Sequence, residues 1–325
     1  MTNKILRSLL CTLVLGGASL ALAQDYPSKV ITIIVPFAAG GPSDTVARLT
    51  AQTMGTMLKT QMIVENVGGA GGTIGAARLT QARPDGYTVF IHHIGQATAP
   101  ALYRKLAYDP IADFAPIGLI NDGAMALVAR KDFPANNLKE FTTYAVANKS
   151  KLNLANAGVG SASHLCGMLL MAELNADFTT IPYKGTGPAM NDLLGGQVDF
   201  MCDQTTNNTS QIKAGKIKAY GVTTAKRLAA LPEVPTMREG GMPHFTVTVW
   251  HAMYAPKGTP QPIIDKLSKA LQEALKDPTL KQRFADLGSE PVAQERATPE
   301  ALRAHLKSEI DKWGPIIKKA GVFAD

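Results

Sequence analysis

Two glycine-rich loops contain the residues of this chain that are best suited to bind a small anion. The first loop follows the apolar, β-branched run Ile31–Val35 and contains Gly40 and Gly41, with Ser43 and Asp44 just after them. Because such a loop leaves backbone N–H groups free at the positive end of a helix dipole, it favours a carboxylate or phosphate ligand. Ser43 or Asp44 is expected to cap the following helix. A tight strand-to-helix turn without a ligand is the alternative interpretation.

The second loop repeats this plan far downstream in the sequence. Gly158 and Gly160 precede Ser161, and Ser163 and His164 follow at the start of an apolar helix. If both loops face one cleft, each can donate backbone N–H bonds to the same carboxylate, with help from the serine hydroxyls. Ser161 and His164 are also the best pair for nucleophilic catalysis, but a helix cap and a first-turn residue explain them more simply. No catalytic residue and no enzyme activity are therefore predicted.

Further candidates lie beside the first loop and at the end of a central strand. Phe37 and Ala39 belong to the loop itself, and Phe37 either covers a planar ligand or fills the core. Thr73 begins a helix after a glycine cluster and is expected to be both a cap and a ligand donor. His92 and His93 end a strand at the edge where open α/β sheets bind ligands. Each of these histidines either has a structural role or faces the cleft, and His93 is the candidate for the cleft.

The first residues have the pattern of a secretory signal peptide. Lys4 and Arg7 precede the apolar stretch 8–22, and small residues lead to a cleavage site before Gln24. Residues 1–23 are therefore predicted to be removed, and the mature protein is expected in the periplasm. An N-terminal membrane anchor is the alternative interpretation.

Composition narrows the possible classes of ligand. The full chain has a formal net charge of +7, and loss of Lys4 and Arg7 with the signal peptide lowers it by two. Such a mild excess favours small anions. Aromatic residues make up only 6% and do not alternate with basic ones, which argues against nucleic acid. No Cys and His residues have the spacing of a metal site, so no metal and no cofactor are expected.

Three residues of the later part of the chain are expected beside the same wall of the cleft. Asp203 follows the predicted strand 198–202 and is either the N-cap of the next helix or a hydrogen-bond acceptor in the cleft. Cys166 lies in the helix after the second loop, and Cys202 ends the strand before Asp203. In an oxidising compartment such a pair often forms a disulfide, which is the prediction. Two buried thiols are the alternative.

Strand and helix patterns alternate along the chain, which predicts an α/β fold with parallel sheets. A long β-rich run near residues 245–254 is followed only by helices, which have no new sheet to cover and must pack back on the first domain. The chain therefore crosses between domains near residues 122–128 and again near 245–250. The predicted domains are 24–124 plus 248–325, which hold the first loop, and 125–247, which hold the second. Two crossings make a hinge on which the lobes can close.

Several distinctive motifs are spread over the whole mature chain. They are Pro36-Phe37-x-x-Gly40-Gly41-x-x-Asp44, Asp85-Gly86-Tyr87-Thr88, Gly158-x-Gly160-Ser161-x-x-His164-Leu165, Pro182-Tyr183-Lys184-Gly185, Asp192-Leu193-Leu194-Gly195-Gly196-Gln197-Val198-Asp199 and Ala255-Pro256-x-Gly258-Thr259-Pro260. Together these motifs resemble the tripartite tricarboxylate transporter receptor (Bug) family. The resemblance implies a type II periplasmic binding protein fold, with two Rossmann-like lobes and a double hinge. It also implies that the loops of the two lobes hold one carboxylate. The position of Asp203 matches the one that meets the amino group of amino-acid ligands in this family, whereas the stretch 92–98 departs from the family pattern.

Together these features predict a periplasmic solute-binding receptor that closes on a small organic carboxylate. The polar cluster after Asp203 contains no basic group, which favours a dicarboxylate or an aromatic carboxylate over a tricarboxylate. The resemblance implies the membrane subunits of a tripartite tricarboxylate transporter as partners, and the receptor is expected to be a monomer. A sensor partner of a membrane kinase is the alternative function, and a hydrolase using Ser161 and His164 is a remote one.

Overall fold

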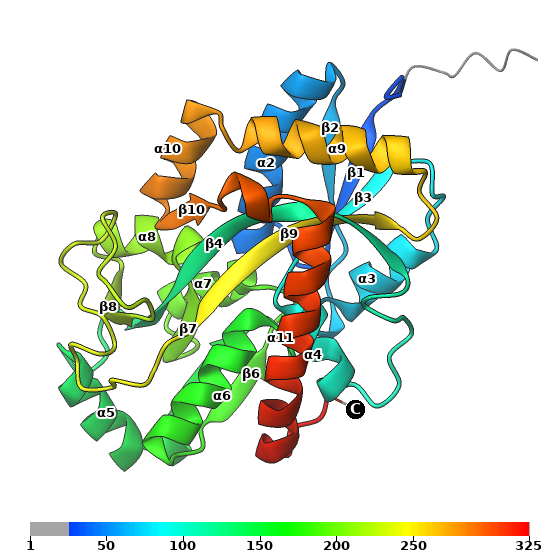
Figure 1. Ribbon diagram of the computed structural model, residues 1–325. Coiled ribbons are helices and arrows are strands. Elements are labelled where there is room, and N and C mark those ends of the chain that lie inside the picture. Colours follow the sequence, from blue (N-terminus) through cyan, green and yellow to red (C-terminus); the bar gives the residue numbers. More distant parts are fainter. Residues whose placement is uncertain (1–25, 325) are drawn as a thin grey trace, which may run out of the picture.

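The computed structural model of the protein describes residues 26–324, and the predicted signal peptide lies outside the described residues. In the described part, ten strands form one continuous sheet that is flanked by helices (Figure 1). The strands run in the order β2-β1-β3-β9-β4-β7-β5-β6, and both β8 and β10 pair with β4. The prediction of an α/β fold is confirmed. None of the helices within residues 26–324 combines the length and apolar character needed to cross a membrane.

One half of the sheet, which we call the first lobe, is built around the N-terminal strands. β1 pairs in parallel with β2 and β3, as expected for a buried β-branched strand between helical connections. β9 lies antiparallel between β3 and β4, although it comes much later in the chain. The strands of this lobe are β1 (Ile31–Val35), β2 (Met62–Asn66), β3 (Thr88–His93), β9 (Thr248–Pro256), the start of β4 (Phe114–Arg130) and β10 (Ser289–Pro291).

The other half, the second lobe, contains the strands between the two passages of the chain. β5 pairs in parallel with β6 and β7, while β7 and β8 are both antiparallel to the end of β4. These strands are β5 (Asn153–Asn156), β6 (Thr179–Pro182), β7 (Phe200–Gln204) and β8 (Ile217–Val222).

β4 is a single long strand that belongs to both lobes. Its residues up to Ala124 pair with β9, the last pair being Ala124 with Thr248, and its residues from Met125 onward pair with β7. At this change of partner the buried Thr223 bonds to Met125 and to the carbonyl oxygen of Val247. The lobes are therefore connected through a continuous strand and its antiparallel neighbour, not through a loose linker.

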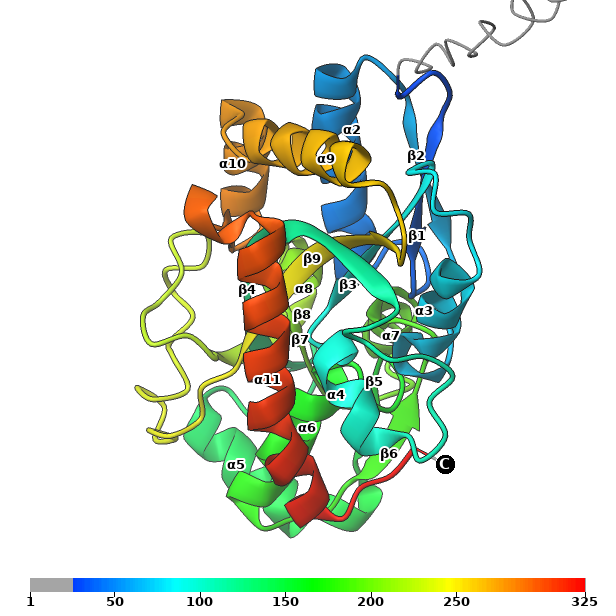
Figure 2. The same cartoon turned by 45° about the vertical axis from the view of Figure 1, so that its right-hand side comes forward.

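Helices cover both faces of the sheet and close the ends of the molecule. In Figures 1 and 2, α9 and α10 lie near α2 at one end, while α11 runs along one side and packs against α4 and β4. The helices are α2 (Pro42–Leu58), α3 (Thr73–Thr80), α4 (Gly95–Leu102), α5 (Leu138–Ala147), α6 (Ala162–Leu174), α7 (Thr186–Leu194), α8 (Thr205–Lys213), α9 (Gln261–Ala274), α10 (Pro278–Asp286) and α11 (Pro299–Ala320).

The end of the chain differs from the sequence-based prediction in one respect. The prediction that only helices follow the last β-rich run was wrong, because β10 pairs antiparallel with β4 through Ser289 and Gly123. β10 is only three residues long, and one of them is Pro291, so its composition does not indicate a strand. Its place in the sheet depends on the neighbouring β4.

Candidate functional site

A cavity with an empty volume of about 240 Å³ lies between the two lobes, where helices from both begin. Its walls come from the first loop and β3 on one side and from the second loop, β7 and α7 on the other. The lining residues are Phe37, Pro42, Ser43, His93, Ala157, Ala162, Ser163, Thr186, Asp203 and Gln204. Larger hollows exist elsewhere, such as the groove beside α6, α11 and residues 244–248, but none of the predicted binding residues lines that groove.

The N-termini of four helices converge on this cavity. Pro42 and Ser43 begin α2, and Ala162 and Ser163 begin α6. Thr186 begins α7, and the N-cap of α8 is Gln204. The first amides of a helix have no acceptor within the helix, and the helix dipole makes this end positive. The cavity therefore has the electrostatic character of an anion site, although Asp203 adds one acidic group to it.

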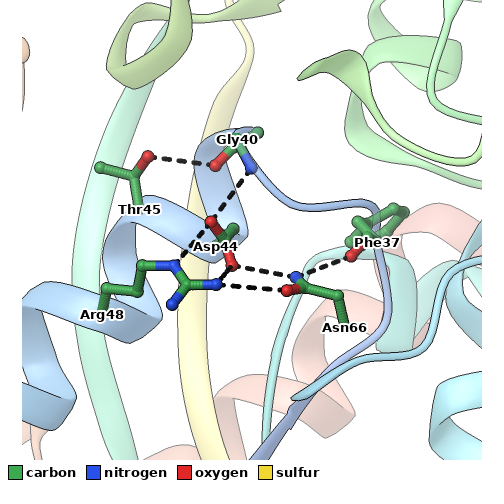
Figure 3. Close-up of polar contacts among 7 residues, drawn as sticks. Phe37, Gly40, Asp44, Thr45, Arg48 and Asn66 are labelled. Carbon is green, nitrogen blue, oxygen red and sulfur yellow. Dashed lines mark hydrogen bonds and ion pairs between the residues drawn. The ribbon is translucent and has the colours of Figure 1, made fainter. Parts of the chain in front are cut away.

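In the first loop, Asp44 is the centre of a hydrogen-bond network (Figure 3). Its carboxylate accepts hydrogen bonds from the Gly40 amide at 3.0 Å, from two nitrogens of Arg48 at 2.9 Å and from Asn66 at 2.9 Å. Asn66 also donates to the carbonyl oxygen of Phe37. Burial alone raises the pKa of Asp44, but the hydrogen bonds from Arg48, the Gly40 amide and Asn66 outweigh it and lower the pKa. Asp44 thus stabilises the loop and does not line the cavity.

The network changes the roles that the sequence indicated for this loop. The Gly40 amide is already bonded to Asp44, and Ala39 and Gly40 are exposed at the rim between the lobes. The prediction that Ser43 or Asp44 caps α2 was wrong, because the N-cap is Gly41 and no side chain bonds to the first amides. The amides of Ser43 and Asp44 therefore lack a side-chain acceptor, and they lie at the end of α2 that borders the cavity.

The second loop is held by its own side chains. Ser161 is the N-cap of α6, and its hydroxyl accepts a hydrogen bond from the amide of His164. The ring Nδ1 of His164 accepts a hydrogen bond from Gly160, and burial lowers the pKa of this histidine to about 4. Ser163 accepts a hydrogen bond from the amide of Ala157 at 2.8 Å and lines the cavity. Of this loop's predicted residues, only Ser163 lines the cavity, while Gly160, Ser161 and His164 shape the loop behind it.

Contacts between the loops hold the lobes together around the cavity. The amide of Ala38 donates to the carbonyl oxygen of Lys184 at 2.8 Å, and the Tyr103 hydroxyl donates to the carbonyl oxygen of Val159 at 3.0 Å. Thr98 on α4 donates to the carbonyl oxygen of Gly160 at 3.1 Å. These bonds join residues of the first lobe to backbone of the second, so the lobes are closed on each other.

Asp203 contributes a carboxyl group to the far wall of the cavity. Its side chain is 1% exposed and accepts a hydrogen bond from Asn207 at 2.6 Å. Burial raises its pKa to about 7, although hydrogen bonds from Asn207, the Gln204 amide and Thr186 act in the opposite direction. The interpretation of Asp203 as the N-cap of α8 was wrong, because Gln204 occupies that position. Asp203 instead lines the cavity as a hydrogen-bond acceptor that is close to half protonated near neutral pH.

His93 lines the cavity, whereas His92 does not. The ring of His93 stacks on Phe37 with centroids 4.7 Å apart, and its Nδ1 accepts a hydrogen bond from the Gly95 amide at 2.9 Å. Burial lowers the pKa of His93 to about 3, so the ring is neutral and carries its proton on Nε2. His92 lies behind His93, with its ring centroid 4.8 Å from that of His93 and 5.7 Å from that of Phe37, and its ring leaves no room for a Cβ at Gly72.

The prediction that Thr73 caps α3 was wrong, and Thr73 does not line the cavity. The N-cap of α3 is Gly72, and the Thr73 hydroxyl donates to the carbonyl oxygen of Ala70 outside the cavity. Sequence reasoning also missed Thr186 as a lining residue. Its signal was the preceding Gly185, another glycine before a helix. A Cβ added to Gly185 would lie 2.9 Å from the backbone nitrogen of Ala38, so the missing side chain lets the first loop approach this point.

The two cysteines of the described chain form a disulfide between Cys166 on α6 and Cys202 on β7, with their Cα atoms 5.8 Å apart. α6 begins at the second loop, and Cys202 directly precedes Asp203. The disulfide therefore fixes two walls of the cavity relative to each other. Among residues 26–324, no group of three or more His, Cys, Asp or Glu side chains is placed to hold a metal ion.

Comparison with known proteins gives one consistent result. A family model described as tripartite tricarboxylate transporter family receptor matches residues 46–322. A protein of Agrobacterium vitis, the UPF0065 protein in the TAR-I ttuE-ttuC' intergenic region, is 52% identical over 93% of this chain and 87% of its own length.

Two solved structures are similar over nearly the whole chain. The structure of the periplasmic binding protein BugD is 53% identical, covers 92% of this chain and 99% of its own, and superposes with a TM-score of 0.90. MatC from Rhodopseudomonas palustris with bound malate is 42% identical, covers 90% of this chain and 100% of its own, and has a TM-score of 0.86. The type II periplasmic binding protein fold that the motifs implied agrees with these matches.

Proposed function

The chain belongs to the tripartite tricarboxylate transporter receptor family, and from this membership we propose that it is a periplasmic receptor that closes on a small organic carboxylate. The observation that carries the proposal is the cavity between the lobes, on which the N-termini of α2, α6, α7 and α8 converge. A carboxylate is the group that such a set of free amides and positive helix ends stabilises most.

The ligand carboxylate would lie between the start of α2 and the start of α6. The amides of Ser43 and Ser163 are first-turn amides without an acceptor in their helices. The Nε2–H of His93 adds a neutral donor on the first lobe, and the hydroxyl group of Ser163 adds a polar group on the second. Each hydrogen bond to a charged acceptor contributes on the order of 1.5–3 kcal/mol, so a few of them support micromolar binding after ordering costs.

Residues on the second lobe would determine the specificity for the part of the ligand beyond this carboxylate. Asp203, Thr186 and Gln204 line the far wall, and none of them is basic. A second ligand carboxylate could share a proton with Asp203, whose pKa burial raises to about 7, or hydrogen-bond to Thr186 and Gln204. Phe37 lines the same cavity and provides an apolar face for an aromatic ligand. We therefore propose a dicarboxylate or an aromatic carboxylate, and the malate bound to the related MatC supports the first of these.

Opening and closing would occur about the two strands that connect the lobes. We propose domains 24–124 plus 248–325 and 125–247, because the pairing of β4 changes from β9 to β7 between Ala124 and Met125. Closure would bring the two loops onto one ligand and change the outer surface of the protein.

The closed, loaded receptor would deliver its ligand as a monomer to the membrane subunits of a tripartite tricarboxylate transporter. Export through the predicted signal peptide 1–23 would place it in the periplasm beside them. The same change of surface could instead signal to a membrane kinase. Transport of the ligand that survives deletion of this receptor would favour the sensor.

We propose no catalytic role for the site. Ser161 and His164 are used for capping and for holding the Gly160 amide, so this serine has no base positioned to take its proton. Ester or amide turnover that is lost in Ser161→Ala would contradict this assignment.

Isothermal titration of the mature protein against a panel of mono-, di- and tricarboxylates and aromatic carboxylates tests the proposal. We expect at least one to bind with micromolar affinity. Ser163→Ala should weaken that ligand by about tenfold, because it removes one hydroxyl from the cavity while the backbone amides remain. Ser210→Ala is the matched control, since Ser210 is an exposed helical serine of the same lobe. No binding by any carboxylate would reject the proposed function.

A further inference from the structure

A buried chain of four hydrogen bonds runs from the cavity wall through the first lobe. Ser43 Oγ lies 3.1 Å from Nε2 of His251, and Nδ1 of His251 lies 3.0 Å from Oδ1 of Asn121. The amide nitrogen of Asn121 donates to Oγ of Ser289 at 2.6 Å, and Ser289 donates to the carbonyl oxygen of Asp122 at 3.0 Å. The chain thus joins α2, β9, β4 and β10, which lie close together in Figure 1. We call these four bonds the relay.

The direction of every proton in the relay follows from its last member. A carbonyl oxygen can only accept, so Ser289 must donate its single proton to Asp122 and can only accept from Asn121. The amide nitrogen of Asn121 therefore faces Ser289, and its oxygen faces His251. Because that oxygen can only accept, Nδ1 of His251 carries the ring proton.

The state of the histidine decides the state of Ser43. His251 is fully buried, and burial together with the nearby His93 keeps its pKa well below the usual range, so the ring is neutral. A neutral ring with its proton on Nδ1 has only a lone pair on Nε2. Ser43 must donate to that lone pair, so its one hydroxyl proton points away from the cavity.

Ser43 therefore offers the cavity an oxygen that can accept but not donate. We propose that Asn121, His251 and Ser289 are positioning residues for ligand specificity, and that the bound carboxylate carries a hydroxyl group on the carbon next to it. The ligand hydroxyl donates to Ser43 Oγ while its carboxylate takes the amides at the start of α2. An ammonium group in the same place would face the positive end of that helix, which disfavours it. This inference rests on the proposed function and adds the substrate class.

Pairs of acids that differ only in this hydroxyl test the inference. The probes are glycolate and acetate, lactate and propionate, and malate and succinate, measured by thermal shift and isothermal titration. In each pair that binds, we expect the hydroxy acid to bind about tenfold more tightly or better, because the other acid leaves the buried Ser43 oxygen without a donor. An equal or tighter affinity for the acids without a hydroxyl, or for the 2-amino acid aspartate, would overturn the inference but leave the proposed function intact. Binding only of carboxylates without a 2-hydroxyl would also overturn the inference and leave the proposed function intact. If no carboxylate binds, both the inference and the proposed function are rejected.

Variants of the relay separate its positioning role from a purely structural one. In Asn121→Leu the histidine can move its proton to Nε2, and Ser43 can turn its own proton toward the cavity. We expect the affinity ratio of hydroxy to deoxy acid to fall by about tenfold. Ser289→Ala, a smaller change at the far end, should lower the ratio in the same direction and decides the question if Asn121→Leu does not fold. Neither residue lines the cavity.

Thr223→Val is the matched control. Thr223 is equally buried and also hydrogen-bonded near β4, but it lies outside the relay. This variant should lose stability and leave the affinity ratio unchanged. A structural role for the relay would weaken both acids of a pair in parallel, so an unchanged ratio in the folded relay variants would refute the proposal.

Discussion

The close approach of the lobes at Gly71 gives a sharp test of closure. Gly71 has φ of 59°, and a Cβ added to it would lie 1.8 Å from the carbonyl oxygen of Val159 on the second lobe. Real Cβ atoms essentially never come nearer than 3.0 Å to such an atom. In Gly71→Ala the two backbones must therefore separate locally by about 1.2 Å, which the closed arrangement does not allow.

The cost of this separation can be worked out from the neighbouring bonds. Moving Val159 away stretches its bond from the Tyr103 hydroxyl, now 3.0 Å, beyond hydrogen-bond distance. The nearby bond from the Ala38 amide to Lys184, now 2.8 Å, is stretched as well. At roughly 1 kcal/mol each, the closed state loses about 2 kcal/mol, and ligand affinity should fall about thirtyfold. An open form without these contacts does not suffer this clash.

Isothermal titration and small-angle scattering would measure the two consequences together. The wild type should become more compact with saturating ligand, whereas Gly71→Ala should bind weakly and keep a larger radius of gyration. Gly215→Ala is the control, because Gly215 has a similar φ of 63° but nothing within 4 Å of its added Cβ. It carries the same backbone strain without touching the other lobe. Wild-type affinity and full compaction in Gly71→Ala would refute the view that this contact belongs to the ligand-bound state.

Three further predictions concern stability. The raised pKa of Asp203, about 7, means that its contribution to stability is present below pH 4 and lost as the pH rises through 7. The stability of Asp203→Asn relative to that of the wild type, measured by melting temperature, should therefore increase from pH 4 to pH 8, by the equivalent of up to about 4 kcal/mol. A difference that does not change with pH would contradict a raised pKa at Asp203. Non-reducing mass analysis of exported protein should show Cys166 bonded to Cys202, and Cys166→Ala with Cys202→Ala should lower the unfolding free energy by about 4 kcal/mol for a loop of this length; free thiols in the fresh protein would argue against the bond. Arg48→Met leaves the carboxylate of Asp44 without its cation, so stability should fall by about 1–2 kcal/mol in chemical denaturation, and an unchanged midpoint would show that Asn66 and the Gly40 amide suffice.

Local patterns in the sequence were enough to predict much of the fold. The strand, glycine loop and helix from Ile31 to Leu58 follow from β-branched residues and glycines that act on their immediate neighbours. The first half of β4 was missed, because Pro116 and Gly118 interrupt its strand pattern. That half is a strand because it pairs with β9, with irregular register near these residues. Such pairing between distant segments has no local signal.

In the candidate site, too, local motifs predicted some features, whereas contacts between distant segments were not predictable. The two loops were identified from their glycines and serines, and Phe37, Ser43, His93, Ser163 and Asp203 all line the cavity. Which groups remain available to a ligand depends on hydrogen bonds that the sequence does not reveal, such as the bond from Gly40 to Asp44. The relay was not foreseen at all, because Asn121 and His251 are 130 residues apart and meet only where β4 and β9 pair.

The position of β9 also determines the order in which the two lobes can be completed as the chain folds from its N-terminus. All strands of the second lobe except the end of β4 lie in one stretch, residues 153–222, which follows β4 after helix α5. The sheet of the first lobe has a gap between β3 and β4 until residues 248–256 arrive to fill it. A chain that emerges from its N-terminus can therefore finish the second lobe first, while the first lobe waits with two exposed strand edges. During that interval the unpaired edges of β3 and β4 are the places where the incomplete first lobe can pair with another chain.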